Sequence, residues 1–250
     1  MNVTILGSGT NVHPRRAAAG YLVQTDQPFL IDFGPRTLTN LLKTGLNRHQ
    51  LQYLLFTHYH ADHFSDFITF YFDAVCHARY VANRPALTIS GPKGTKRLFR
   101  SIFKNFPAFD NPPFSVTLQE VGTRPFRIGN TYITPRKMTH TDSQTCLGYR
   151  VEYQGRSLAY SGDACYSPNL VQLCQDVDLA ILDCSFPSNR PGVAHMHAED
   201  CGRVAKEAGV KRLVLSHFYP IAEQFNIKKQ AARAFSGRIT LAKDLMSVTW

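Results

Sequence analysis

The stretch "LLFTHYHADHF", residues 54–64, decides how this chain folds and what chemistry it can carry. An apolar run ends here and is followed, within six residues, by His58, His60, Asp62 and His63. A strand or loop gains nothing from such a grouping, since protonated histidines would repel one another. Neutral imidazole and carboxylate are ligands that zinc accepts. We therefore interpret the stretch as part of a metal site whose other ligands lie elsewhere in the chain.

Length and composition are typical of a globular protein. The chain has 250 residues, of which 44% are hydrophobic and 18% charged, enough to bury a substantial core. No run approaches the roughly 20 apolar residues that a membrane helix needs. The start "MNVTILGSGT" has β-branched residues where a secretory signal would have basic ones. These features predict a cytoplasmic protein that does not contact a membrane.

Cysteine usage and charge add two further expectations. The six cysteines lie in apolar surroundings without a Cys-x-x-Cys pair, so we expect reduced thiols and not a disulfide framework. The net charge of +10 favours anionic ligands, because the summed field raises their local concentration. Nucleic acid and phosphate esters are such ligands.

Short apolar stretches alternate with helical patterns along the chain. The stretches "NVTILG", "GYLVQT", "PFLIDFG", "LQYLLFTH", "ALTISG", "YITPRKM", "LGYRVEY", "SLAYSGD", "DLAILDCSF" and "RLVLSHF" read as strands. The segment "YQGR" between two of them is typical of a hairpin turn. Helices are expected near residues 36–45, 64–80, 94–105, 168–175, 197–209 and 227–235. This order predicts an α/β fold of sheets covered by helices.

The number of ligands near residue 58 indicates two ions. His58 and His60 can face one ion, and Asp62 and His63 a neighbouring one, because one tetrahedral site does not need four ligands from a single loop. Two ions about 3.5 Å apart would use all four. The missing ligands should also follow strands, and the candidates are His140 in "KMTHTD", Asp163 in "AYSGDAC" and His217 in "VLSHFYP".

With these residues in order, the chain resembles the metallo-β-lactamase superfamily. "HYHADH" matches that superfamily's His-x-His-x-Asp-His signature, and the later single His, "SGD" and "SHF" follow in the same order. "ILGSGT", "LIDFG", "ISGPKGTKRL" and "LGYRVE" resemble the ribonuclease Z group within it. The similarity covers essentially the full chain. It implies one domain over residues 1–250 with a four-layer αββα metallo-β-lactamase sandwich.

The resemblance also implies a ligand set. One zinc would be held by His58, His60 and His140, and the second by Asp62, His63 and His217, with Asp163 bridging the two. A hydroxide between the two Zn²⁺ ions would be the nucleophile, and Asp62 is counted with the catalytic residues. Mn²⁺ or iron are alternatives to zinc.

Two further motifs concern the leaving group. Ribonuclease Z-like proteins hold a proton-donating histidine with a carboxylate, and here Asp183 in "ILDCSF" and His195 in "AHMHAED" stand at those positions. A carboxylate fixes the tautomer of a histidine and raises its pKa, which suits a general acid. We interpret His197 as the residue that begins the following helix, with a second contact to substrate as the alternative.

Two departures from the ribonuclease Z pattern bear on substrate. Enzymes that process transfer RNA carry a long arm, but only 22 residues separate His140 from Asp163. The N-terminal loop "HPRRAAAG" keeps two positive charges, Arg15 and Arg16, without the Arg-Asn of that group. We therefore expect a dinuclear-zinc phosphodiesterase that acts on a nucleotide, a cyclic nucleotide or an RNA 3′-end phosphodiester.

Several alternatives stay open at this point. The chain could be an arylsulfatase, a lactonase, a β-lactamase or a transfer RNA 3′-endonuclease of the same superfamily. An iron redox protein is disfavoured because those members carry Glu where His60 stands, and a non-catalytic RNA-binding protein is disfavoured by the complete ligand set. A homodimer is expected from the resemblance. The basic stripe Lys93–Lys104 is interpreted as a solvated face, with contacts to phosphates as the alternative. Phe67 and Tyr71 are interpreted as core residues, with a place in the pocket wall as the alternative.

Overall fold

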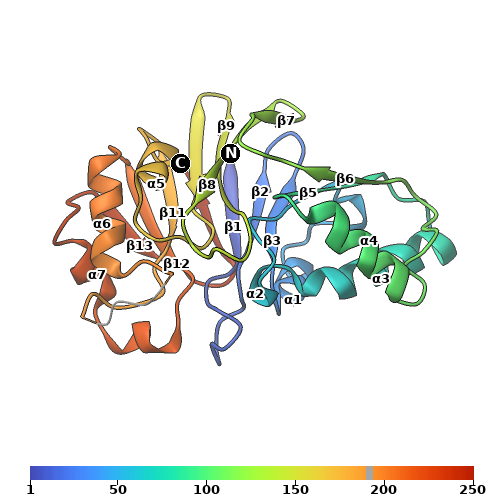
Figure 1. Cartoon of the computed structure of the whole chain (residues 1–250), viewed down its shortest axis with the longest axis horizontal. Helices are drawn as coiled ribbons and strands as arrows, with labels where there is room; N and C mark the ends of the chain where they lie inside the picture. Colours follow the sequence, from blue (N-terminus) through green and yellow to red (C-terminus); the bar gives the residue numbers. More distant parts are fainter. Residues whose placement is uncertain (190–193) are drawn as a thin grey trace.

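The computed structural model describes residues 1–189 and 194–250. Two seven-stranded sheets face each other in the middle of the molecule, and helices cover both outer faces (Figure 1). Helices α1 to α4 lie on one side and α5 to α7 on the other. The four-layer αββα sandwich expected from the sequence is confirmed.

The first sheet has the strand order β14-β1-β2-β3-β4-β5-β6. Its antiparallel half pairs β14, β1, β2 and β3, and its parallel half pairs β3, β4, β5 and β6. The strands are β1 (Asn2–Gly7), β2 (Gly20–Gln24), β3 (Phe29–Phe33), β4 (Tyr53–Leu55), β5 (Leu87–Gly91), β6 (Val116–Glu120) and β14 (Met246–Thr249).

The second sheet has the order β13-β12-β11-β10-β9-β8-β7. Strands β7 to β10 are antiparallel neighbours, and β10 to β13 are parallel ones. The strands are β7 (Phe126–Ile128), β8 (Thr131–Met138), β9 (Cys146–Tyr153), β10 (Arg156–Tyr160), β11 (Leu179–Asp183), β12 (Arg212–Ser216) and β13 (Arg238–Leu241).

Helices connect the parallel strands, as such crossovers require. The helices are α1 (Thr37–Leu42), α2 (Ala61–Phe64), α3 (Asp66–Tyr80), α4 (Thr95–Asn105), α5 (Pro168–Leu173), α6 (Ala198–Glu207) and α7 (Ile227–Ala231). Two short 3₁₀ helices cover Arg48–Gln50 and Pro220–Gln224. Among the described residues, none of the helices combines the length and apolar character that crossing a membrane needs.

Strand alternation divides the hydrophobic side chains between two cores. In β2, Tyr21 and Val23 point to the core between the sheets, whereas Leu22 points to the core under α3 and α4. Successive side chains of a strand face opposite sides, so a strand covered on both faces is apolar throughout. Phe67 and Tyr71 of α3 are fully buried in the second core, which confirms their interpretation as core residues.

Most of the expected elements are present, and four strands were not foreseen. The hairpin predicted at "YQGR" joins β9 to β10, with Gln154 and Gly155 both in the left-handed region at φ 49° and 71°. The unforeseen strands are β6, β7, β13 and β14, which are short and mostly half-buried or exposed. Their sequences carry little apolar signal because they lie toward the edges of the two sheets. All six cysteines are free thiols, and four of them are buried.

Candidate metal centre

The segment after β4 brings four of the predicted donor residues to one edge of the first sheet. His58 and His60 lie in the connection that follows the strand, and Asp62 and His63 lie on the short helix α2, whose N-cap residue is His60. His58 and His63 are fully buried, whereas His60 is half-buried. One short segment of the chain therefore supplies four candidate metal donors at the same edge of the sheet.

Strand ends of the second sheet supply the other three predicted donors. His140 follows β8, Asp163 follows β10, and His217 follows β12. His217 has φ 61°, a left-handed conformation that is uncommon for a residue with a side chain and is concentrated at functional sites. The structure thus brings together all seven residues that the sequence proposed as donors, from both sheets.

The first donor cluster contains three imidazole nitrogens and one carboxylate oxygen. His60 Nδ1 lies 3.0 Å from His58 Nε2 and 3.2 Å from His140 Nε2. Asp163 Oδ2 is 3.6 Å from both His58 Nε2 and His140 Nε2. These four donors could hold a metal ion.

The second donor cluster uses the other oxygen of the same aspartate. Asp163 Oδ1 lies 3.0 Å from His63 Nε2 and 3.2 Å from His217 Nε2. The two imidazole nitrogens are 3.3 Å apart, and Asp62 Oδ2 is 3.5 Å from His217 Nε2. The two carboxylate oxygens of Asp163 therefore face two separate clusters, which is the geometry of a bridging ligand.

The distances between the donor atoms match the spacing of ligands around a divalent cation. Zinc–nitrogen bonds of about 2.0–2.1 Å in a tetrahedron separate neighbouring donors by about 3.3 Å, close to the nitrogen–nitrogen distances of both clusters. Asp163 Oδ1 is buried and receives no well-directed hydrogen bond despite its two close nitrogens. A buried carboxylate oxygen in that position is costly unless a cation neutralises it.

Asp32 in β3 is a supporting residue that the sequence interpretation missed. Its carboxylate accepts hydrogen bonds from the Thr57 amide at 2.8 Å, the Tyr160 hydroxyl at 3.0 Å and His63 Nδ1 at 2.8 Å. The Thr57 hydroxyl donates to the same carboxylate. The signal was an aspartate inside the apolar stretch "PFLIDFG", because a buried carboxylate needs several donors.

Other contacts fix the orientation of the remaining imidazoles. His140 Nδ1 donates to the carbonyl oxygen of Ala194 at 2.6 Å, and His58 Nδ1 contacts the Thr57 hydroxyl at 3.0 Å. His217 Nδ1 lies 3.1 Å from the Ser185 hydroxyl. These contacts occupy Nδ1 and leave Nε2 of each ring as the free donor atom, and they keep the rings from turning.

His195 lies beside the two clusters and is held by Asp183. His195 Nδ1 is 2.9 Å from Asp183 Oδ2, and the His195 ring centroid is 4.9 Å from that of His140 and 5.5 Å from that of His217. The full length of the Asp183 side chain therefore reaches His195 directly, although an aspartate is one methylene shorter than the glutamate of the family pattern.

Charge and burial shift the pKa of Asp163 and of His217 in opposite directions, whereas at His58 the charge of His63 acts in the same direction as burial. Burial disfavours the ionised form of Asp163, but the charges of His217 and His63 outweigh it and hold the pKa of Asp163 well below its usual range. Burial lowers the pKa of His58, and the charge of His63 lowers it further. Burial would also lower the pKa of His217, but Asp163 and Asp183 raise it to about 10. Metal binding must displace such protons, so it is expected to depend on pH.

His197 does not reach the centre. It is the N-cap residue of α6, and its Nδ1 accepts a hydrogen bond from the Asp200 amide at 3.4 Å, while Nε2 lies 3.2 Å from Asp200 Oδ2. This is the placement expected from the sequence. His195 and His197 therefore occupy different environments, although only one residue separates them.

The two arginines of the N-terminal loop are largely committed to structural contacts. Arg16 donates to the Ser8 hydroxyl at 2.7 Å, to the Ala242 carbonyl oxygen at 2.8 Å and to Glu223 at 2.8 Å. Arg15 also pairs with Glu223. Their charges are therefore partly neutralised, and the loop is anchored to the second half of the chain.

Comparison with known proteins identifies the family to which most of the chain belongs. Residues 28–218 match the family model described as "Beta-lactamase superfamily domain". The chain is 27% identical over 248 residues to the probable metallo-hydrolase YhfI of Bacillus subtilis, covering 98% of each protein, and 26% identical over 275 residues to a ribonuclease Z of Mycobacterium bovis, covering 99% of this chain and 98% of that protein. The crystal structure of YhfI matches with a TM-score of 0.86 at 25% identity, covering 99% and 98% of the two chains, and the short form of human tRNase Z matches at 0.79 and 22% identity, covering 100% and 99%.

Proposed function

Because the chain belongs to the metallo-β-lactamase superfamily, we propose that it is a dinuclear metal-dependent phosphodiesterase that acts on nucleotide substrates. The family match, YhfI and the ribonuclease Z relative support a metallo-hydrolase. The two donor clusters around Asp163 support a pair of divalent cations, with zinc as the first candidate because imidazole and carboxylate suit it.

The position of His195 is the observation that carries the choice of a phosphodiester. Its Nδ1 is occupied by Asp183, so Nε2 is the nitrogen that can give a proton to a leaving oxygen. The Asp183 carboxylate raises the pKa of His195 against the effect of burial, which favours the protonated ring that a general acid needs. A lactone or β-lactam opened by an activated water needs no such separate acid.

The residues divide the reaction between them. Bound cations would polarise the phosphate oxygens and make a water molecule more acidic. Asp62 and Asp163 place negative charge beside the candidate cation sites. Buried residues behind the imidazoles, such as Asp32, keep the rings aligned. A water oxygen adds to phosphorus and gives up a proton to solvent, the bond from phosphorus to the leaving oxygen breaks, and the leaving oxygen takes a proton from His195.

Transfer RNA 3′ processing is the second candidate, and the ribonuclease Z relative favours it. Against it, most of the segment between His140 and Asp163 folds into β9 and β10. That hairpin leaves no chain for the long arm expected there in transfer RNA-processing members. The homodimer, the cytoplasmic location and the single domain stay predictions.

The test compares two leaving groups on the zinc-loaded protein. Bis(p-nitrophenyl) phosphate releases p-nitrophenolate, a weak base that leaves without a proton, whereas the thymidine dinucleotide TpT releases an alkoxide that needs one. His195→Ala should lower kcat for TpT by about 10²–10⁴-fold and change turnover of bis(p-nitrophenyl) phosphate far less. His197→Ala is the matched control, because it removes a neighbouring imidazole that caps α6.

Two results would overturn the proposal. One is the absence of phosphodiester hydrolysis by the metal-loaded protein when p-nitrophenyl sulfate, a lactone or a β-lactam is hydrolysed. The other is an equal loss of TpT cleavage in the His195 and His197 variants, since that would trace the effect to folding and not to proton donation.

A further inference from the structure

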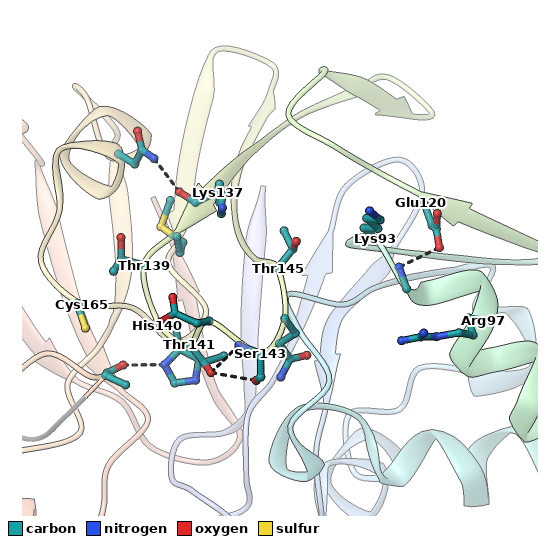
Figure 2. A pocket seen from close by; sticks show the side chains of 16 residues that line it. Lys93, Arg97, Glu120, Lys137, Thr139, His140, Thr141, Ser143, Thr145 and Cys165 are labelled. Carbon is teal, nitrogen blue, oxygen red and sulfur yellow. Dashed lines mark hydrogen bonds between the residues drawn. The ribbon is translucent and has the colours of Figure 1, made fainter.

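A large cavity opens beside the candidate metal centre. It has a volume of about 1030 Å³. Lys93, Gly94, Arg97 and Glu120 line one side, and residues 137–145 line the other. His140 belongs to its lining, so the cavity reaches the first donor cluster (Figure 2). Ligand sites usually measure about 300–1,000 Å³, so this cavity can take much more than a single phosphate group.

Three cationic side chains stand on opposite walls of this cavity. Lys93 directly precedes Gly94, the N-cap residue of α4, and Arg97 lies in the first turn of that helix. Figure 2 shows the Arg97 side chain extending toward the loop of Thr141 and Ser143. Lys137, at the end of β8, lies on the facing wall. The stripe interpreted from the sequence as a solvated face is therefore divided, because two of its members border the cavity.

The charges of these three groups are not neutralised by nearby acids. Within residues 1–189 and 194–250, no carboxylate oxygen lies within 4.0 Å of the Lys93, Arg97 or Lys137 nitrogens. Glu120 Oε1 accepts instead from the amides of Gly94 at 2.9 Å and Lys96 at 3.2 Å. Glu120 thus caps α4, and Asp142, the other acidic residue of the lining, is exposed to solvent.

The rest of the lining favours polar ligand groups over stacked rings. Hydroxyl and amide side chains come from Thr139, Thr141, Ser143, Thr145, Gln144 and Asn169. The described lining contains no Phe, Tyr or Trp. Proteins that bind nucleic acid mainly through its bases usually offer aromatic rings for stacking, so phosphate and sugar oxygens are the groups that this cavity can recognise.

We propose that Lys93, Arg97 and Lys137 bind a second phosphate of the substrate, next to the phosphodiester that is cut. This inference rests on the proposed phosphodiesterase function and narrows it to linear nucleotides that carry a further phosphate. A cyclic mononucleotide has a single phosphate, which would lie at the metal centre and leave the three cations without a partner. A terminal or neighbouring phosphate of a short oligonucleotide would meet them.

The experiment uses three dinucleotides with the same scissile bond: TpT, pTpT with a 5′-terminal phosphate and TpTp with a 3′-terminal phosphate. For the zinc-loaded protein, kcat/KM for one phosphate-bearing form should exceed that for TpT by about tenfold or more, the effect of one charge-assisted contact. Testing both forms covers either orientation of the substrate. The advantage should shrink as salt is raised, because exposed charges are screened.

Paired variants test whether the effect comes from the cations that line the cavity. The double variant Lys93→Gln with Arg97→Gln should reduce the advantage of the phosphate-bearing dinucleotide to less than about twofold. The control, Lys96→Gln with Arg100→Gln, removes one lysine and one arginine from exposed positions of α4 that do not line the cavity. The control should keep the advantage.

The outcomes separate this inference from the function on which it rests. Equal kcat/KM values for all three dinucleotides, or no cleavage of any dinucleotide by a protein that hydrolyses bis(p-nitrophenyl) phosphate, would overturn the inference alone. An equal loss in both double variants would also overturn it, because it would assign the effect to net charge. Failure to hydrolyse bis(p-nitrophenyl) phosphate would instead count against the phosphodiesterase proposal.

Discussion

Replacing Asp32 by Asn tests whether the buried carboxylate that holds His63 sets the metal affinity. The carboxylate is 1% exposed and accepts from the Thr57 amide and hydroxyl, from Tyr160 and from His63. An asparagine of the same size has one oxygen, and its NH₂ group would face a donor. At least one of these contacts must therefore be lost.

The expected cost has two parts. Losing a charge-assisted hydrogen bond inside the protein costs about 1.5–3 kcal/mol of unfolding free energy without metal. Loosening His63, which Asp32 contacts at 2.8 Å, should also weaken metal binding by about 10–100-fold. At saturating metal this weaker binding removes a further 1.4–2.7 kcal/mol, roughly, of stabilisation.

Urea unfolding with and without chelator measures the first part, and competition with a chromogenic chelator measures the metal affinity. Tyr160→Phe is the control, because it removes one donor to Asp32 at 3.0 Å and leaves the contact with His63 intact. It should cost about 1 kcal/mol and leave metal affinity unchanged. An Asp32→Asn protein that binds metal as tightly as the wild type would refute the role given to this carboxylate.

Three further outcomes are expected. Metal analysis should find two zinc ions per wild-type chain and a reduced content for His60→Ala, with hydrolysis of bis(p-nitrophenyl) phosphate falling at least about 100-fold; wild-type turnover by this variant would contradict the ligand assignment. Asp183→Asn should lower the pKa of His195, which the carboxylate raises. The alkaline limb of the plot of kcat against pH for TpT should therefore move to lower pH. An unchanged limb would exclude His195 as the acid, and loss of metal would give Asp183 a structural role. A Cβ at Gly34 would lie 1.9 Å from the Asp62 carbonyl oxygen. Gly34→Ala should therefore lower the free energy of unfolding, measured with heat or urea, by about 1–3 kcal/mol. Unchanged stability and metal content would show that the backbone at Asp62 can move without cost.

The fold was largely predictable because its strands are short, apolar and clearly bounded. Strands buried on both faces, such as β3 and β11, are apolar over most of their length. The strands β6 and β14 were missed because residues at the margin of a sheet bury little surface and follow no clear pattern. The amphipathic helix α4 was recognised, but the sequence did not show which of its basic residues border a cavity.

The residue types and their order along the chain were enough to propose the seven candidate donors, because imidazole and carboxylate groups clustered after strand ends are costly unless they bind a cation. How these residues meet is visible only in the folded chain: residues up to 159 positions apart converge, and the two oxygens of Asp163 face different clusters. The contact of Asp32 with His63 and the placement of cations on opposite walls of the cavity are likewise visible only in the folded chain. They depend on which strand ends and helix starts lie side by side, and that proximity comes from packing two sheets together and not from any local pattern.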